Sequence, residues 1–140
     1  MEKENIFIIV SIAVILLAVL GGWQFGLFAK IFAGPEPITV PQGILLFFGD
    51  GCPHCKNVED FVVANKIEEK VKFTRLEVPF ASKTSPQLVD NAKIAIQLAQ
   101  KCKIDATNGV GIPFLYDGKG NCVDGDVNVI NFFKNEAGIK

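Results

Sequence analysis

The chain has 140 residues, of which 49% are hydrophobic, and its 14 basic and 15 acidic residues leave a net charge of −1. The length allows one domain of ordinary size, and the high apolar fraction indicates an additional membrane segment. Charges of both signs are interspersed, so no basic face is available to neutralise a phosphate backbone. We therefore expect no nucleic-acid partner.

An uncharged apolar run, IFIIVSIAVILLAVLGGWQFGLF, covers residues 6–28. At about 1.5 Å per residue, a helix of this length crosses a hydrocarbon core of about 30 Å. A cleaved signal peptide or a buried helix is the alternative, but the run is much longer than a typical signal core. We expect residues 1–33 to form an N-terminal tail and a transmembrane anchor, with the lipid bilayer as partner of residues 6–28.

The charges that flank this run favour one orientation only weakly. Lys3 and the α-amine lie on one side and Lys30 on the other, which favours a cytoplasmic N-terminus. A short tail, one span and one large domain form the layout of a signal anchor. We expect a single-pass protein of the cell membrane whose main domain is extracytoplasmic.

A proline-rich stretch, GPEPITVPQG, follows at residues 34–43. Three prolines and the absence of apolar periodicity are typical of a stiff, extended spacer. The remaining residues, 44–140, are then the soluble domain.

The first half of this domain predicts strand, helix and strand. Residues 44–48, ILLFF, form an uninterrupted apolar run suited to a central strand covered on both faces. A helix should begin at Pro53, where the missing N–H costs nothing. Its apolar positions recur at helical spacing, at Val58, Phe61 and Val62. Residues 71–78, VKFTRLEV, alternate only in part, which predicts a less buried second strand.

The second half predicts a helix, two strands and a closing helix. Thr84 or Ser85 should cap a helix that has Pro86 in its first turn. Its apolar face should contain Leu88, Ala92, Ala95, Ile96 and Ala99. Residues 113–123 read as two short strands joined at residues 117–120, and Asp126 should cap the last helix.

Two motifs lie within this order of elements. CPHC, residues 52–55, stands between the first strand and the first helix, and GIP, residues 111–113, stands just before the third strand. In both respects the domain resembles the thioredoxin superfamily. The resemblance implies a thioredoxin-like α/β fold of order βαβαββα, with a four-stranded mixed sheet flanked by helices.

Within that superfamily, the chain resembles two different branches in different details. The pair Pro53-His54 is found in DsbA-type disulfide oxidases, whereas the compact layout and the GD before the last helix are more similar to glutaredoxin. The tryptophan that precedes the first cysteine in many thioredoxins is replaced by Gly51.

The placement of the cysteine pair predicts different roles for its members. At a helix start, Cys52 faces unpaired N–H groups and the positive end of the helix dipole, which stabilise a thiolate. We expect Cys52 to be the nucleophile and Cys55, one turn further and more buried, to resolve mixed disulfides. His54 can add a donor or a positive charge near the same sulfur. A stabilised thiolate makes the disulfide a stronger oxidant.

The resemblance also implies how substrates would bind. A cis bond at Ile112-Pro113 would lie beside Cys52, and Ile112 would pair with an extended substrate segment through its main chain. We expect a thiol-disulfide oxidoreductase that acts on proteins carrying thiols or disulfides and needs no cofactor. Oxidation is favoured over reduction, and a membrane or soluble redox partner must regenerate the cysteine pair.

Other interpretations of these residues remain open. The four cysteines are not spaced like a structural zinc site, so we expect no metal there, but the pair could be a structural bridge, or could hold Cu(I) in a binding module or metallochaperone. Proton transfer to Cys55 is conceivable for Asp50, Lys56 and Glu59, and glutathione binding for Asp124 and Asp126. Solvated charges, turns and caps are the alternative for these five residues.

Cys102 and Cys122 remain. Cys102 should end the second helix and Cys122 should begin the fourth strand, both on the side of the domain remote from the CPHC motif. We expect a structural disulfide between them. The alternative is two buried free thiols.

Overall fold

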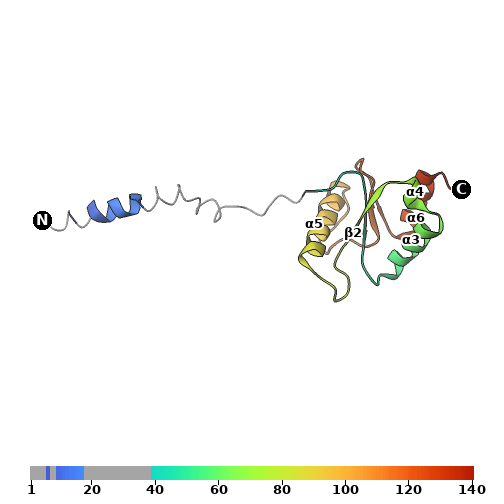
Figure 1. The fold of residues 1–140 in the computed structure, drawn as a ribbon, viewed down its shortest axis with the longest axis horizontal. Helices are drawn as coiled ribbons and strands as arrows, with labels where there is room; N and C mark the ends of the chain where they lie inside the picture. Colours follow the sequence, from blue (N-terminus) through green and yellow to red (C-terminus); the bar gives the residue numbers. More distant parts are fainter. Residues whose placement is uncertain (1–5, 7–8, 18–38) are drawn as a thin grey trace. The chain divides into compact units, whose positions relative to one another are not determined.

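The computed structural model describes residues 6, 9–17 and 39–140, and the chain divides into two units, Met1–Pro37 and Ile38–Lys140 (Figure 1). In the first unit, residues 9–17 are helical, and their large apolar side chains are exposed. Within the described ranges, no helix combines the length and the apolar character that crossing a membrane requires. The predicted span over residues 6–28 and the predicted spacer over residues 34–43 both include residues outside these ranges.

The second unit is built on a mixed sheet of four strands. These are β1 (Ile44–Phe48), β2 (Phe73–Glu77), β3 (Phe114–Tyr116) and β4 (Cys122–Asp124), in the spatial order β2-β1-β3-β4. β1 pairs in parallel with β2 and antiparallel with β3, and β3 pairs antiparallel with β4. The predicted strands are confirmed, and β1 is central, as its continuous apolar run indicated.

Helices cover both faces of the sheet: α3 (Pro53–Ala64), α4 (Ile67–Lys70), α5 (Pro86–Lys101) and α6 (Asp126–Ala137). Figure 1 shows α5 on one side of the sheet and α3, α4 and α6 on the other. The domain is therefore an α/β layer structure. Only the short helix α4 was absent from the sequence prediction.

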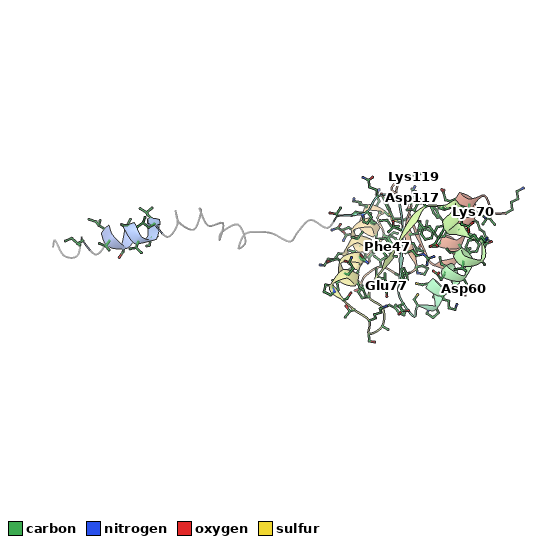
Figure 2. The ribbon with its side chains drawn as sticks, in the orientation of Figure 1. Phe47, Asp60, Lys70, Glu77, Asp117 and Lys119 are labelled. Carbon is green, nitrogen blue, oxygen red and sulfur yellow. A yellow bond between two sulfur atoms is a disulfide. The ribbon has the colours of Figure 1, made fainter. Side chains whose placement is uncertain are left out.

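Alternation along β1 divides the core into two clusters. Leu45 and Phe47 pack on the α5 side, together with Phe114 from β3. Leu46 packs on the opposite side, with Leu115 and with Phe133 of α6. Figure 2 shows Phe47 in the middle of the domain. Successive residues of a strand point to opposite faces, so a continuous apolar run is what a doubly covered strand requires.

Helix α5 begins as predicted but buries a different stripe. Ser85 is its N-cap and accepts a hydrogen bond from the backbone N–H of Leu88 at 3.3 Å. Its buried residues are Leu88, Asn91, Ile94, Ala95, Leu98 and Ala99, whereas the expected Ala92 and Ile96 are only half-buried. The stripe is rotated because Asn91 turns inward and donates to the carbonyl oxygen of Glu77 at 2.7 Å.

The prediction that Asp126 caps the last helix is wrong by one residue. Gly125 is the N-cap of α6, and Asp126 is the first helical residue. Gly125 has φ of 77°, a conformation that glycine adopts without a steric penalty. The side chain of Asp126 is thereby left free to contact α3.

Cys102 and Cys122 form a disulfide, with a Cα–Cα distance of 5.9 Å. Cys102 is the C-cap of α5, and Cys122 is the first residue of β4. The bridge therefore ties the end of α5 to the edge of the sheet. The predicted disulfide is confirmed, and the alternative of two free thiols is wrong.

Candidate active site

The CPHC motif lies where β1 ends and α3 begins. Pro53 opens α3, as predicted, and Cys52 is its N-cap. The backbone N–H of Cys55 donates to Sγ of Cys52 at 3.3 Å. A backbone N–H of the first helical turn, which has no partner within the helix, thus donates to a sulfur. In most helices the acceptor at this position is a side-chain oxygen.

The two sulfurs of the motif face each other. Sγ of Cys55 lies 2.7 Å from Sγ of Cys52, and both cysteines are free thiols. The short loop before them is fixed by a hydrogen bond of 3.2 Å from the N–H of Cys52 to the carbonyl oxygen of Gly49. The pair can therefore close into a disulfide with little movement of the backbone.

The expectation that Cys55 is more buried than Cys52 is wrong. Cys52 is 5% exposed and Cys55 is 7% exposed. Cys52 is covered because the segment before β3 packs against it, with the carbonyl oxygen of Ile112 3.9 Å from its sulfur. The Ile112-Pro113 bond is cis, as expected, and Pro113 is fully buried.

The chemical difference between the cysteines is electrostatic. Burial, followed by the hydrogen bond to Cys52, raises the pKa of Cys55 to about 12. Low polarity disfavours a thiolate, and the neighbouring Cys52 sulfur adds to the effect. Cys55 is therefore the proton-holding member of the pair, and Cys52 is the member whose sulfur accepts an N–H of the helix.

His54 turns toward the last helix. Its Nδ1 lies 3.2 Å from Oδ2 of Asp126, which also accepts a hydrogen bond of 2.6 Å from Nδ2 of Asn57. The bonds from Asn57 and then His54 lower the pKa of Asp126. In the part of the chain that the structure describes, His54 makes no hydrogen bond to Cys52, so its effect on that sulfur would act through space.

The loop after β2 folds against the active-site turn. Nζ of Lys83 lies 3.1 Å from Oδ2 of Asp50 and 2.6 Å from Oε1 of Glu77. Hydrogen bonds to Glu77 and then to Asp50 raise the pKa of Lys83. Asp50, one of the proposed proton carriers for Cys55, is thus engaged in an ion pair.

Phe80 and Ile112 close over Gly49 beside the same turn. A Cβ at position 49 would lie 2.5 Å from Cβ of Phe80 and 2.7 Å from Cδ1 of Ile112. Only glycine fits in the space that these two side chains leave at position 49.

A cavity of about 710 Å³ adjoins the motif, and Cys52 and Cys55 both line it. Lys56, Glu59 and Arg75 also line it. Glu59 forms an ion pair with Arg75, and Lys56 pairs with Asp60 at 2.8 Å. Arg75 lies on β2, and sequence reasoning missed it because no local signal joins a residue of β2 to α3.

Asp124, a candidate for glutathione binding, has surroundings that indicate a structural role. The carbonyl oxygen of Asp124 accepts a hydrogen bond from Asn128 at 3.0 Å at the start of α6. Among the described residues, no group of three or more His, Cys, Asp or Glu side chains could hold a metal ion. Within residues 39–140, a metal at the motif would have Cys52 and Cys55 as its two ligands, which is a coordination that soft Cu(I) tolerates.

Searches against protein-family models, curated proteins and solved structures give no match to this chain.

Proposed function

We propose that this chain is a membrane-anchored protein thiol-disulfide oxidoreductase of the thioredoxin superfamily. The observation that carries the proposal is that Cys52 is the N-cap of α3 and has Sγ of Cys55 2.7 Å away. Helix N–H groups and the helix dipole favour a thiolate at this position, which is what a nucleophilic cysteine needs. The strand order β2-β1-β3-β4 and the buried Pro113 beside the motif agree with the family.

The reaction starts from a disulfide between Cys52 and Cys55. A thiolate of the substrate protein attacks Sγ of Cys52, the bond to Cys55 breaks, and Cys55 leaves as a thiolate and takes a proton. A second substrate thiolate then attacks the substrate sulfur of the mixed disulfide, and Cys52 leaves as a thiolate. The substrate loses two electrons and gains a disulfide, and the pair is reduced to two thiols.

The asymmetry of the pair favours this direction. The N–H of Cys55 donates to Sγ of Cys52 and stabilises negative charge on that sulfur in the reduced form. Stabilisation of the reduced form makes a disulfide more oxidising. A redox partner that supplies a disulfide must then accept two electrons from the pair to start a new cycle.

An extracytoplasmic location is part of the proposal. The disulfide between Cys102 and Cys122 supports it, because structural disulfides persist in oxidising compartments. The uncharged run over residues 6–28 supplies the anchor. The protein should stay in the membrane through carbonate washing and should expose residues 44–140 to protease on the outer side; recovery of a soluble form that begins near residue 34 would contradict the anchor.

A trapping experiment tests the activity. The Cys55→Ser variant, expressed at full length in its membrane, should accumulate mixed disulfides with substrate proteins at Cys52, because no second thiol releases them. The Cys52→Ser variant is the matched control and should trap none. A protein that traps nothing, lacks insulin-reduction activity and retains copper after purification under reducing conditions would instead be a metal carrier.

A further inference from the structure

The start of α6 contacts the start of α3 beside the cysteine pair. The two helices pack against each other on one side of the sheet (Figure 1). His54, in the first turn of α3, reaches Asp126, the first residue of α6, with Nδ1 3.2 Å from Oδ2. His54 lies between the two cysteines of the motif in the sequence. Whatever fixes its ring therefore also decides which hydrogen bond the ring can offer to Cys52.

Asp126 is the fixed partner in this contact. Its Oδ2 also accepts a hydrogen bond of 2.6 Å from Nδ2 of Asn57, and its Oδ1 accepts one of 3.0 Å from the backbone N–H of Val127. The side chain of Asp126 is 18% exposed, whereas that of His54 is 71% exposed. The carboxylate is thus held by two further donors and the imidazole ring is largely in solvent, so the ring is the part of the contact that can turn.

The contact decides which nitrogen of His54 carries a proton. An ionised carboxylate can only accept hydrogen bonds, so Nδ1 must donate to Asp126. The neutral form of an imidazole has a single N–H, and its other nitrogen is an acceptor. With that N–H used at Asp126, the neutral ring has none left for a thiolate at Cys52. The Cys52 sulfur accepts the N–H of Cys55 at 3.3 Å instead.

Resting on the proposed function, we infer that Asp126 is a positioning residue, which keeps the His54 N–H away from the Cys52 thiolate and so moderates the oxidising strength of the pair. Without the carboxylate, the ring can turn its N–H toward the sulfur of Cys52, two positions earlier in the chain. A hydrogen bond to the thiolate stabilises the reduced form, and a more stable reduced form makes the disulfide a stronger oxidant.

The equilibrium of the pair with 2-mercaptoethanol measures this strength. Two molecules of the reagent reduce the Cys52–Cys55 disulfide to two thiols and leave as one molecule of their own disulfide, so two electrons pass to the pair. The reagent has neither a carboxylate nor an amine that could bind at Asp126.

The full-length protein in detergent is equilibrated at pH 8, above the range in which imidazole groups ordinarily gain a proton. After an acid quench and alkylation, peptide mapping by mass spectrometry gives the reduced fraction of Cys52 and Cys55. The same map reports Cys102 and Cys122 separately.

A double-mutant cycle isolates the effect that acts through His54. Asp126→Ala should raise the equilibrium constant for reduction of the pair about tenfold, which is the effect of one added hydrogen bond to a charged group. In the His54→Ala background, the same substitution should change the constant less than twofold. An effect of Asp126 on the fold alone would persist in that background.

Two further variants complete the cycle. Asp126→Asn keeps an acceptor oxygen of the same size, so it should shift the constant in the same direction as Asp126→Ala but by less. It also serves as the test if the alanine variant does not fold. Asp124→Ala is the matched control, because it removes an exposed carboxylate two positions before Asp126. It should leave the constant within about twofold of the wild-type value.

The outcomes separate this inference from the proposed function. A constant that Asp126→Ala leaves unchanged or lowers would overturn the positioning role, and so would an equal rise with and without His54. In each of these cases the pair still exchanges with the reagent, and the proposed function stands. A wild-type pair that forms no disulfide between Cys52 and Cys55 in the oxidised reagent would overturn the proposed function, and the positioning role with it.

Discussion

The backbone N–H of Cys55 donates to Sγ of Cys52 at 3.3 Å, so one residue of the pair stabilises charge on the other. The reverse does not hold. Burial raises the pKa of Cys55, and the hydrogen bond to the Cys52 sulfur raises it further. The two thiols are almost equally buried, and the N–H of Cys55 is directed at the Cys52 sulfur.

This difference predicts unequal alkylation of the reduced protein. With a pKa of about 12, roughly one Cys55 in ten thousand is a thiolate at pH 8. Iodoacetamide should therefore modify Cys52 at least about a hundredfold faster, because only the thiolate reacts. Peptide mapping by mass spectrometry measures both rates. The rate at Cys55 should rise about tenfold per pH unit toward pH 10, and similar rates at the two sites would show that the roles are assigned wrongly.

The contact between α3 and α6 predicts a pH-dependent part of the stability. Hydrogen bonds from Asn57 and His54 lower the pKa of Asp126 below its ordinary value of 3.8. A carboxyl group with a depressed folded-state pKa contributes stability above its unfolded pKa, and this is lost as the pH falls through the folded value. Asp126→Asn should therefore lower the free energy of unfolding near pH 6 more than near pH 2.5.

Urea unfolding of the full-length protein in detergent, followed across this pH range, checks this prediction. Asp124→Asn is the matched control, since the Asp124 side chain is exposed at the neighbouring end of β4 and has no hydrogen-bond partner among the described residues. Its effect on the free energy of unfolding near pH 6 should be small. Parallel curves for Asp126→Asn and the wild-type protein would contradict the prediction.

Local patterns in the sequence predicted most of the fold. The apolar run of β1, the proline at the start of α3 and the serine before α5 each act over a few residues, and each is confirmed. The cap of α6 was misplaced because Asp126 is a good capping residue in isolation, whereas Gly125 has the backbone conformation that the turn needs.

What sequence reasoning missed depends on residues far apart in the chain. Asn91 lies within an apolar stripe because the carbonyl oxygen of Glu77 needs a donor, and Arg75 reaches Glu59 from a neighbouring strand. The burial of Cys52 depends on Ile112, which is 60 residues away. Periodicity and spacing carry no information about such pairs. The resemblance to the thioredoxin superfamily placed Ile112 beside Cys52, but the burial of Cys52 and the cavity next to it were not predicted.

The disulfide between Cys102 and Cys122 should make a large contribution to stability. It joins residues 20 apart in the sequence, and closing a loop of this length in the unfolded chain stabilises the folded state by about 3 kcal/mol. The double variant Cys102→Ala, Cys122→Ala should lose roughly this free energy of unfolding in urea. The alkylation rate at Cys52 should remain that of the wild-type protein. The bridge joins α5 to β4, whereas Cys52 lies at the start of α3. A loss of stability well below 1 kcal/mol would show that the bridge contributes little.

Gly49 should be the most sensitive glycine beside the motif. Replacement by alanine would place a Cβ 2.5 Å from Cβ of Phe80 and 2.7 Å from Cδ1 of Ile112, so both side chains must move. Overpacking of this kind costs about 1–3 kcal/mol of the free energy of unfolding.

Gly111→Ala is the matched control, since a Cβ at that position meets nothing within 4 Å. It should leave the urea midpoint almost unchanged, whereas Gly49→Ala should lower it. Because Ile112 also places its carbonyl oxygen near Sγ of Cys52, Gly49→Ala should change the alkylation rate at Cys52 as well. Loss of stability with an unchanged alkylation rate would mean that the packing around Gly49 supports the fold alone. Equal stability of the two variants would mean that Phe80 and Ile112 do not crowd position 49.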